Sequence, residues 1–259
     1  MTPRRLTQVG ILALAVLLCA MQPVAAQTVD TLSAKEIVRR ADELLRGKTM
    51  QGKYRMTIMR PDWQRSTEFA FWSEGTEKSF IRILSPPKDR GVAFLKIGRQ
   101  MWQYIPRINR VIKIPPSMML ESWMGSDFTN DDLVKESSIV EDYTHRLLGR
   151  EKLGGDEAYK IELTPKPDAP VTWARVVEWI RVSDLIPLRA EYFNERGEHI
   201  RTLRFADVKE MGGRRLPARM ELIEETKPGH KTVLLLEEAV FDRPIPSSIF
   251  SQENLRRRM

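Results

Sequence analysis

The 259-residue sequence has little of the chemistry on which enzymes and metal proteins depend. It contains one cysteine, which excludes a disulfide framework, a cysteine-based zinc site and an iron–sulfur cluster. Its histidines, His145, His199 and His230, have no second ligand at metal spacing, so we predict exposed residues of strands or turns. No H-E-x-x-H, G-x-S-x-G, Walker or dinucleotide-type glycine motif is present. The sequence therefore predicts no catalytic residue, no cofactor and no metal site, and a protein that is not an enzyme.

A calcium-binding loop is missing as well. Asp127, Asp131 and Asp132 lie close together, but they lack the alternating D-x-D-x-D-G order and the distal glutamate of an EF-hand. We predict that these carboxylates cap local helices.

Long apolar runs are absent, apart from Ile11–Met21 near the N-terminus. Arg4 and Arg5 precede this run, and Val24–Ala26 supplies the small residues of a signal-peptidase site. The run is too short to span a bilayer comfortably, which takes about 20 apolar residues. We predict a cleaved signal peptide over residues 1–26, with an uncleaved N-terminal anchor as the alternative, and hence a periplasmic protein.

The excess of positive charge is small once this segment is removed. The full sequence has 42 Lys and Arg against 35 Asp and Glu, a net charge of +7; without Arg4 and Arg5 the balance is 40 against 35, or +5. Three of these positive charges are Arg256–Arg258 near the C-terminus. A mildly basic, exported chain does not indicate a nucleic-acid partner.

One amphipathic helix is predicted at the start of the mature chain. Ser33 and Glu36 form a capping box, and Gly47 provides a C-terminal stop, which places the helix over Ala34–Arg46. Its apolar residues fall on one face, so the helix needs a surface on which to pack.

A long series of predicted strands follows the helix. Apolar and polar residues alternate with period two, which is typical of antiparallel strands with one buried face. The expected strands include 54–58, 69–71, 79–84, 92–97, 100–105, 110–114, 139–148, 159–163, 176–182, 188–193, 199–208, 218–225 and 232–240. No linker divides the series, so we predict a single domain over residues 27–259, mainly β with flanking α. A sheet of about eleven to thirteen strands is expected to coil toward a barrel with a concave apolar face.

One segment, Ser117–Val134, interrupts the strands, with a short second helix expected to begin at Asn130 or Asp131. Methionine side chains adapt to ligands of varied shape, so this segment suggests an apolar lid over the concave face. The alternative is that its side chains fill the core of the sheet and no ligand enters. The predicted ligand-binding residues, from the lid and from the strands beneath it, are Met118, Met119, Leu120, Trp123, Met124, Phe128, Phe69, Phe71, Trp102 and Tyr104.

The stretch Met124–Leu133, MGSDFTNDDL, resembles the M-G-S-D-F-(T/S)-x-x-D-L motif of the bacterial outer membrane lipoprotein-sorting protein family, which is related to LolA and LolB. Arg82–Gly91, Trp102–Arg107 and the closing stretch Ile245–Phe250 with Leu255 also resemble that family. The resemblance implies an unclosed antiparallel β-barrel, a LolA/LolB-like half-barrel, with helices covering its concave apolar face.

The same resemblance implies a function. It suggests a monomeric periplasmic carrier that binds acyl chains of lipoproteins or other envelope lipids and works beside an inner-membrane transporter of the RND or ABC type. The alternative is a lipid- or lipoprotein-sensing regulatory module of envelope-stress signalling.

Overall fold

An antiparallel sheet of 13 strands runs through the part of the chain that the computed structural model describes, residues 32–134, 139–167, 169 and 171–257. The strand order is β6-β5-β4-β3-β2-β1-β13-β12-β11-β10-β9-β8-β7. The predicted signal peptide, residues 1–26, lies outside the described residues. The strands are β1 (Thr49–Met59), β2 (Gln64–Glu74), β3 (Lys78–Ser85), β4 (Ala93–Ile97), β5 (Gln100–Ile105), β6 (Arg110–Ile114), β7 (Tyr143–Leu153), β8 (Asp156–Pro165), β9 (Arg175–Arg181), β10 (Pro187–Phe193), β11 (His199–Met211), β12 (Arg214–Glu224) and β13 (Lys231–Phe241).

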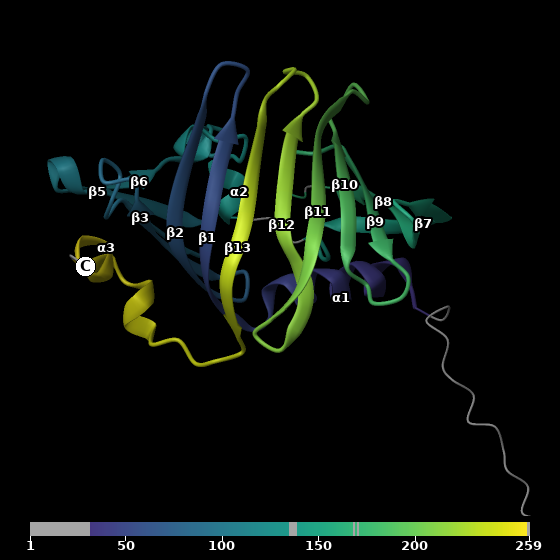
Figure 1. The fold of residues 1–259 in the computed structure, drawn as a ribbon, viewed down its shortest axis with the longest axis horizontal. Coiled ribbons are helices and arrows are strands. Elements are labelled where there is room, and N and C mark those ends of the chain that lie inside the picture. Colours follow the sequence, from purple (N-terminus) through teal and green to yellow (C-terminus); the bar gives the residue numbers. More distant parts are fainter. Residues whose placement is uncertain (1–31, 135–138, 168, 170, 258–259) are drawn as a thin grey trace, which may run out of the picture. The chain divides into compact units, whose positions relative to one another are not determined.

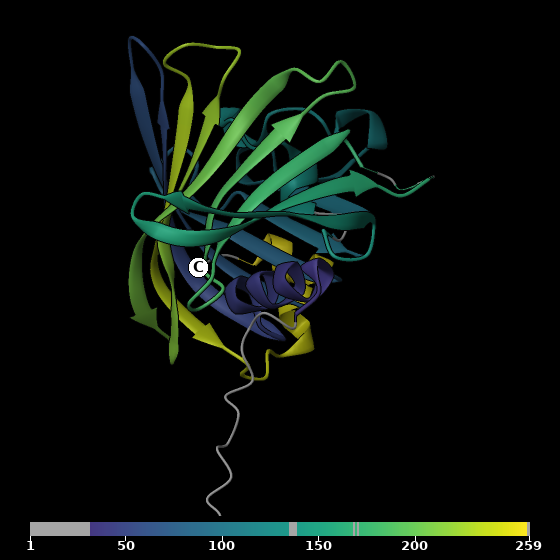
Figure 2. The ribbon, with the colours of Figure 1, turned by 90° about the vertical axis from the view of Figure 1, so that its right-hand side faces the viewer.

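The sheet does not close into a barrel. β1 pairs with both β2 and β13, which joins the first six strands to the last seven. β6 and β7 form the two edges of the sheet. Figures 1 and 2 show the sheet strongly curved, with α1 (Ala34–Arg46) across its lower end. The predicted fold, a mainly β, unclosed antiparallel half-barrel, is confirmed.

The period-two alternation in the sequence corresponds to two different surfaces of this sheet. On β1, Met56 and Ile58 are fully buried, whereas the intervening Thr57 is half-buried and Arg55 is exposed. The buried set belongs to the concave face, because Met56, Ile58, Phe69 and Ile81 share one core cluster. Burial of one face of each strand is what makes the alternating pattern visible in the sequence.

Helix α1 packs on the concave side of the second half of the sheet. Ile37, Val38 and Ala41 join a core cluster with side chains of β7 to β10, among them Tyr159 and Ile161. The Ser33 hydroxyl accepts a hydrogen bond from the Glu36 amide, as predicted. The Glu36 carboxylate itself pairs with Arg39 and Arg40 rather than reaching back to the cap.

The C-terminal segment packs on the outer face of the sheet. The 3-10 helix η5 (Ser247–Phe250) and helix α3 (Gln252–Arg256) place Phe250 and Leu255 against side chains of β3, β4 and β5. Figure 1 shows this segment outside the strands, near β3 and β5. Trp102 and Tyr104 belong to this outer cluster. They therefore lie on the face opposite the one that we predicted for them.

The segment between β6 and β7 contains short helices and turns. They are η3 (Pro116–Met118), η4 (Trp123–Gly125) and α2 (Asn130–Val134), which confirms the predicted second helix; a further 3-10 helix, η2 (Pro106–Ile108), lies between β5 and β6. β7 begins at Tyr143 and not at Ile139, because Ile139 and Val140 form a turn whose side chains pack into the core beneath α1. Among the described residues, no helix has the length and apolar character needed to cross a membrane.

Candidate functional site

The concave face of the sheet holds a cavity of about 270 Å³ that is partly open to solvent. Strands from both halves of the sheet contribute to its wall, and α1 contributes residues near its C-terminal end. Most of the lining side chains are apolar: Leu45, Met50, Tyr54, Phe69, Phe71, Ile81, Phe128, Leu203, Phe205, Met220, Leu222 and Leu234. A wall of this composition suits a ligand with a hydrocarbon portion.

Three aromatic side chains of β1 and β2 form one part of the wall. The Tyr54 and Phe69 rings stack with centroids 5.3 Å apart, and the Phe71 ring meets Tyr54 edge-on at 6.0 Å. The register explains this grouping, because Tyr54 lies opposite Phe69 in the β1–β2 pair. The sequence had suggested Phe69 and Phe71 as cavity residues, and the structure places both in the lining.

The methionine- and tryptophan-rich segment lies over the same face but mostly outside the cavity wall. Trp123 is 1% exposed and packs edge-on against Phe69 and Phe94, with ring centroids 5.5 and 5.6 Å apart. Met119 and Met124 pack partly buried against the same cluster. The Trp123 side chain therefore fills the core of the sheet, as the alternative interpretation of this segment predicts.

The other residues of this segment divide between the cavity and the solvent. Phe128 lines the cavity, whereas Met118 and Leu120 are 48% and 61% exposed. Among the predicted ligand-binding residues, those that line the cavity are therefore Phe69, Phe71 and Phe128.

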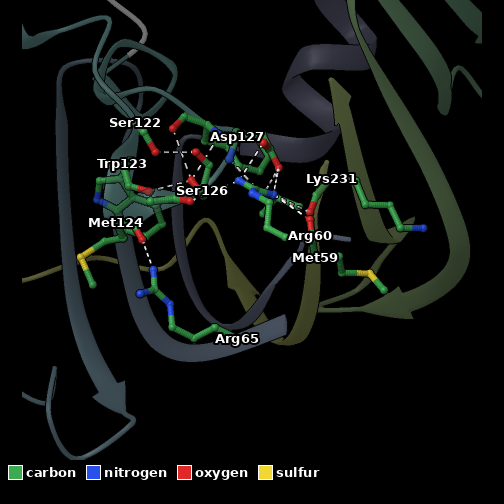
Figure 3. A network of polar contacts seen from close by, with 12 residues as sticks. Met59, Arg60, Arg65, Ser122, Trp123, Met124, Ser126, Asp127 and Lys231 are labelled. Carbon is green, nitrogen blue, oxygen red and sulfur yellow. Dashed lines mark hydrogen bonds and ion pairs between the residues drawn. The ribbon is translucent and has the colours of Figure 1, made fainter. Parts of the chain in front are cut away.

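Two buried ion pairs hold this segment on the sheet. In the first, Asp127 binds Arg60, with Arg60 Nη2 2.9 Å from Asp127 Oδ1 (Figure 3). The Thr232 hydroxyl donates to Asp127 Oδ2 at 2.6 Å, and the Asp127 amide donates back to Thr232 Oγ1 at 3.0 Å. Arg65 donates to the Met124 carbonyl, which fixes the preceding turn (Figure 3).

The second ion pair joins α2 to β11. Arg201 Nη1 and Nη2 lie 2.8 and 2.6 Å from the two carboxylate oxygens of Asp132. Burial alone would raise the pKa of the Asp132 carboxyl, but the Arg201 guanidinium and the hydrogen bonds from Thr129 together outweigh that effect and hold the pKa below its ordinary value. The guanidinium carbon of Arg201 also lies over the rings of Trp173 and Tyr192, at 4.4 and 4.6 Å from their centroids.

Local hydrogen bonds account for further polar residues of the MGSDFTNDDL stretch. Ser126 is buried and donates to the Trp123 carbonyl at 2.7 Å, and the Asn130 side-chain amide donates to the Met118 carbonyl at 2.9 Å. Asp132 accepts from the Thr129 amide at 2.8 Å, so the helix cap predicted for Asp132 is present in addition to the ion pair. For Asp127, capping was the wrong prediction, because its carboxylate binds Arg60 and Thr232 on the sheet.

Comparison with known sequences places the chain in a family. A family model described as "Uncharacterized protein" matches residues 75–257. The chain belongs to that family. Comparison with curated proteins gives no match.

Comparison with solved structures shows which known proteins share the fold of this chain. A LolA superfamily protein from Nitrosomonas europaea is 25% identical, covers 86% of this chain and 99% of its own, and superimposes with a TM-score of 0.73. A DUF1329 family protein from Desulfovibrio piger is 24% identical over 86% of this chain and 97% of its own, with a TM-score of 0.78. A domain from Vibrio parahaemolyticus described as an outer membrane lipoprotein-sorting protein domain is 22% identical over 86% and 98%, with a TM-score of 0.75. The resemblance to LolA-like proteins is thereby confirmed.

The chain also carries polar groups in the cavity that the sequence did not single out. Arg201 lines the cavity from β11, and Lys96, Ser73 and Ser79 line it from β2 to β4. The sequence gives one indirect signal for the ion pair between Arg201 and Asp132. The MGSDFTNDDL stretch contains several acids and no basic residue, so a basic partner has to come from elsewhere in the chain. Among the described residues, no three His, Cys, Asp or Glu side chains are grouped so as to hold a metal ion.

Proposed function

We propose that this protein is a periplasmic carrier that binds acyl chains of lipoproteins or other envelope lipids and catalyses no reaction. The observation that carries the proposal is the apolar cavity beneath a segment that two ion pairs hold on the sheet. Each buried methylene contributes about 0.8 kcal/mol, so the hydrocarbon of a lipid supplies the binding energy without specific polar contacts.

The size of the cavity indicates that loading requires movement. At about 270 Å³ it is slightly smaller than typical ligand sites, which run from about 300 to 1,000 Å³. A whole acyl chain needs more room than this. The segment from Ser122 to Val134 crosses the concave face and makes only short helices outside the strand order, so its displacement would enlarge the cavity without separating any pair of neighbouring strands.

A cover of this kind also supports release. When the lid is closed, Trp123 and Phe128 occupy apolar space that would otherwise face water. The free protein is then nearly as well packed as the loaded one, which limits the affinity and permits transfer to an acceptor. Resemblance supports an inner-membrane transporter of the RND or ABC type as the partner, and a monomer as the working unit.

Native mass spectrometry of the protein recovered from the periplasm, combined with lipid extraction, tests the carrier function. We expect a fraction of the molecules to retain an acyl-containing ligand, or to capture one from lipid vesicles. Protein that is consistently empty and takes up no lipid from vesicles would contradict the proposal.

A further inference from the structure

The edge of the sheet at β6 is rich in basic residues. From Arg90 to Leu120 the sequence contains six Lys and Arg and no Asp or Glu, and Glu121 is the first acid beyond this stretch. Its second part, residues 107–120, runs from η2 through β6 to η3 and is exposed at most positions. Figure 1 shows β5 and β6 at the left of the molecule. We call residues 107–120 the basic edge.

Large apolar side chains are exposed on the basic edge. Ile108 and Ile112 are 54% and 42% exposed, and Met118 and Leu120 are exposed as well. Among the described residues, nine large apolar side chains are exposed, and four of the nine therefore lie on the basic edge. An exposed apolar grouping marks a surface that contacts a protein or a membrane.

The basic residues of this edge are not neutralised by acids. Arg107, Arg110 and Lys113 are exposed, and within the part of the chain that the structure describes none of them forms an ion pair with a carboxylate. The Lys113 ammonium lies 5.9 Å from the centroid of the Trp102 ring, a contact that does not neutralise its charge. Three uncompensated positive charges on one edge attract a negatively charged surface.

The other edge of the sheet, β7, differs in this respect. Leu148 is exposed there too, but the basic side chains beside it face acids of β8. Arg146 Nη2 lies 2.7 Å from Glu162 Oε1, and Arg150 Nη1 lies 3.7 Å from Glu157 Oε1. The β6 edge therefore carries the larger uncompensated positive charge.

The exposed groups surround the β6 edge rather than covering one face of the sheet. Ile112 lies on the same side of the strand as Ile114, which belongs to the concave core cluster. Lys113 lies on the same side as Val111, which packs in the outer cluster. A flat partner that approaches the sheet edge-on can therefore reach side chains of both faces.

The form of β6 favours a membrane over a further β-strand as the partner. β6 has five residues, carries the charges of Arg110 and Lys113, and is followed directly by Pro115 and Pro116. Short edge strands with charged residues and neighbouring prolines resist pairing with another strand. A bilayer with anionic phospholipids needs no backbone pairing, and it presents phosphate groups above an apolar layer.

We propose that the basic edge docks the protein on the surface of a membrane that contains anionic phospholipids. Arg107, Arg110 and Lys113 bind phosphate groups, while Ile108 and Leu120 enter the boundary between head groups and acyl chains. This inference goes beyond the carrier function, because it concerns the surface on which the protein docks and not the content of the cavity.

The basic edge is also joined to the segment that covers the concave face. The Met118 carbonyl accepts a hydrogen bond from the Asn130 side-chain amide at 2.9 Å, and the Met119 carbonyl accepts one from the Asp131 amide at 2.8 Å. Both donors belong to α2. A protein docked by this edge therefore has the start of α2 close to the membrane surface.

The test measures co-sedimentation of the protein with vesicles of phosphatidylcholine, with and without phosphatidylglycerol. The mature chain, which begins near Gln27, is used, because the apolar run of residues 11–21 would bind lipid by itself. We expect binding to the vesicles that contain phosphatidylglycerol, and we expect it to weaken as the salt concentration rises from about 0.05 M to about 0.5 M.

The first variant, Arg107→Gln/Arg110→Gln, removes two charges from the basic edge. Each Lys or Arg near an anionic surface contributes about five-fold in affinity, so we expect binding to fall about ten- to thirty-fold. The matched control, Lys209→Gln/Arg215→Gln, removes two exposed charges from β11 and β12 and should change binding by less than about threefold.

The second variant, Ile108→Ser/Leu120→Ser, removes apolar surface from the basic edge. We expect binding to fall about ten-fold or more at both salt concentrations, since the loss of apolar burial is not screened by salt. Its control is Leu148→Ser/Val240→Ser, which removes two exposed apolar side chains from β7 and β13 and should leave binding within about threefold.

Several outcomes would overturn the docking surface. They are absence of binding to phosphatidylglycerol vesicles, equal losses in the variants and their controls, and a wild type that forms dimers which Ile108→Ser/Leu120→Ser abolishes while vesicles are not bound. If Arg107→Gln/Arg110→Gln loses the circular dichroism spectrum of the wild type, Lys113→Gln replaces it, with an expected loss of about five-fold; unchanged binding there overturns the proposal. Because the variants leave the cavity intact, their retention of acyl ligands in native mass spectrometry reports on the carrier function separately.

Discussion

Arg201 of β11 and Asp132 of α2 form a two-point ion pair that is almost completely buried, with N–O distances of 2.8 and 2.6 Å. The pair connects the segment over the concave face to β11, in the second half of the sheet. Trp173 and Tyr192 flank the guanidinium, so water does not replace either partner easily. This contact therefore helps to hold the segment from Ser122 to Val134 in place on the sheet, together with the Arg60–Asp127 pair.

Breaking this pair from one side is expected to destabilise the protein strongly. Asp132→Leu leaves the Arg201 guanidinium buried without its carboxylate, and Arg201→Met leaves the carboxylate buried; each change should lower the free energy of unfolding by about 3–5 kcal/mol. The double variant should lose less than the sum of the two, because neither charge remains buried alone. Urea denaturation of the four proteins measures the coupling. Additive losses would show that the two side chains do not interact in solution.

The same pair predicts a pH dependence with a defined sign. The pKa of Asp132 is lower in the folded protein than its ordinary value of 3.8, so on acidification the unfolded chain takes up this proton first. The stabilisation is complete above the unfolded pKa and is lost as the pH falls through the folded pKa, with a slope of up to about 1.4 kcal/mol per pH unit between them.

Asp132→Asn isolates this effect from all other carboxyl groups. We expect the difference in unfolding free energy between wild type and Asp132→Asn to be constant from about pH 7 to about pH 5 and to shrink below about pH 4. Urea titrations at a series of pH values provide the measurement. A difference that stays constant to the lowest pH at which both proteins fold would show that the carboxyl does not have a depressed pKa.

Trp123 is expected to matter for stability more than its position in a cover segment suggests. Trp123→Ala removes a side chain that is 1% exposed and packs against Phe69 and Phe94, so the free energy of unfolding should fall by about 3–5 kcal/mol. Leu120→Ala in the same segment is the control; because Leu120 is 61% exposed, its change should stay within about 0.5 kcal/mol. Equal effects of the two substitutions in urea denaturation would mean that the segment is not closed on the sheet in solution.

The fold was largely predictable because burial of one face of the sheet produces an alternation of apolar and polar residues along the strands. The capping residue Ser33 and the stop at Gly47 likewise predicted the bounds of α1, since both act within one turn of the helix. β7 was the exception. The apolar residues Ile139 and Val140 predict the start of a strand, but in the structure they form a turn and pack into the core. Their burial depends on tertiary contacts, which a local pattern does not reveal.

The candidate site was less predictable, because its key contacts join residues far apart in the sequence. Arg60 and Asp127 are 67 residues apart, and Asp132 and Arg201 are 69 apart, so no local pattern marks either partner. Alternation shows that two residues of a strand share a face, but it does not tell which face is concave. For that reason Phe69 and Phe71 were placed correctly in the cavity wall, whereas Trp102 and Tyr104 were placed on the wrong side of the sheet.

The contrast between Phe71 and Trp102 supplies a direct test of the cavity. Phe71 lines it, whereas Trp102 packs on the outer face beneath the C-terminal segment. Phe71→Ala removes part of the surface that contacts an acyl chain, so the affinity for a fluorescent acyl probe should fall about ten-fold, corresponding to about 1.4 kcal/mol. Trp102→Ala should leave probe affinity unchanged in molecules that remain folded, although it lowers the melting temperature. Because both substitutions truncate an aromatic residue of the same sheet, a loss of stability alone would affect them alike. Equal losses of probe affinity, or a loss confined to Trp102→Ala, would show that the probe binds elsewhere on the protein.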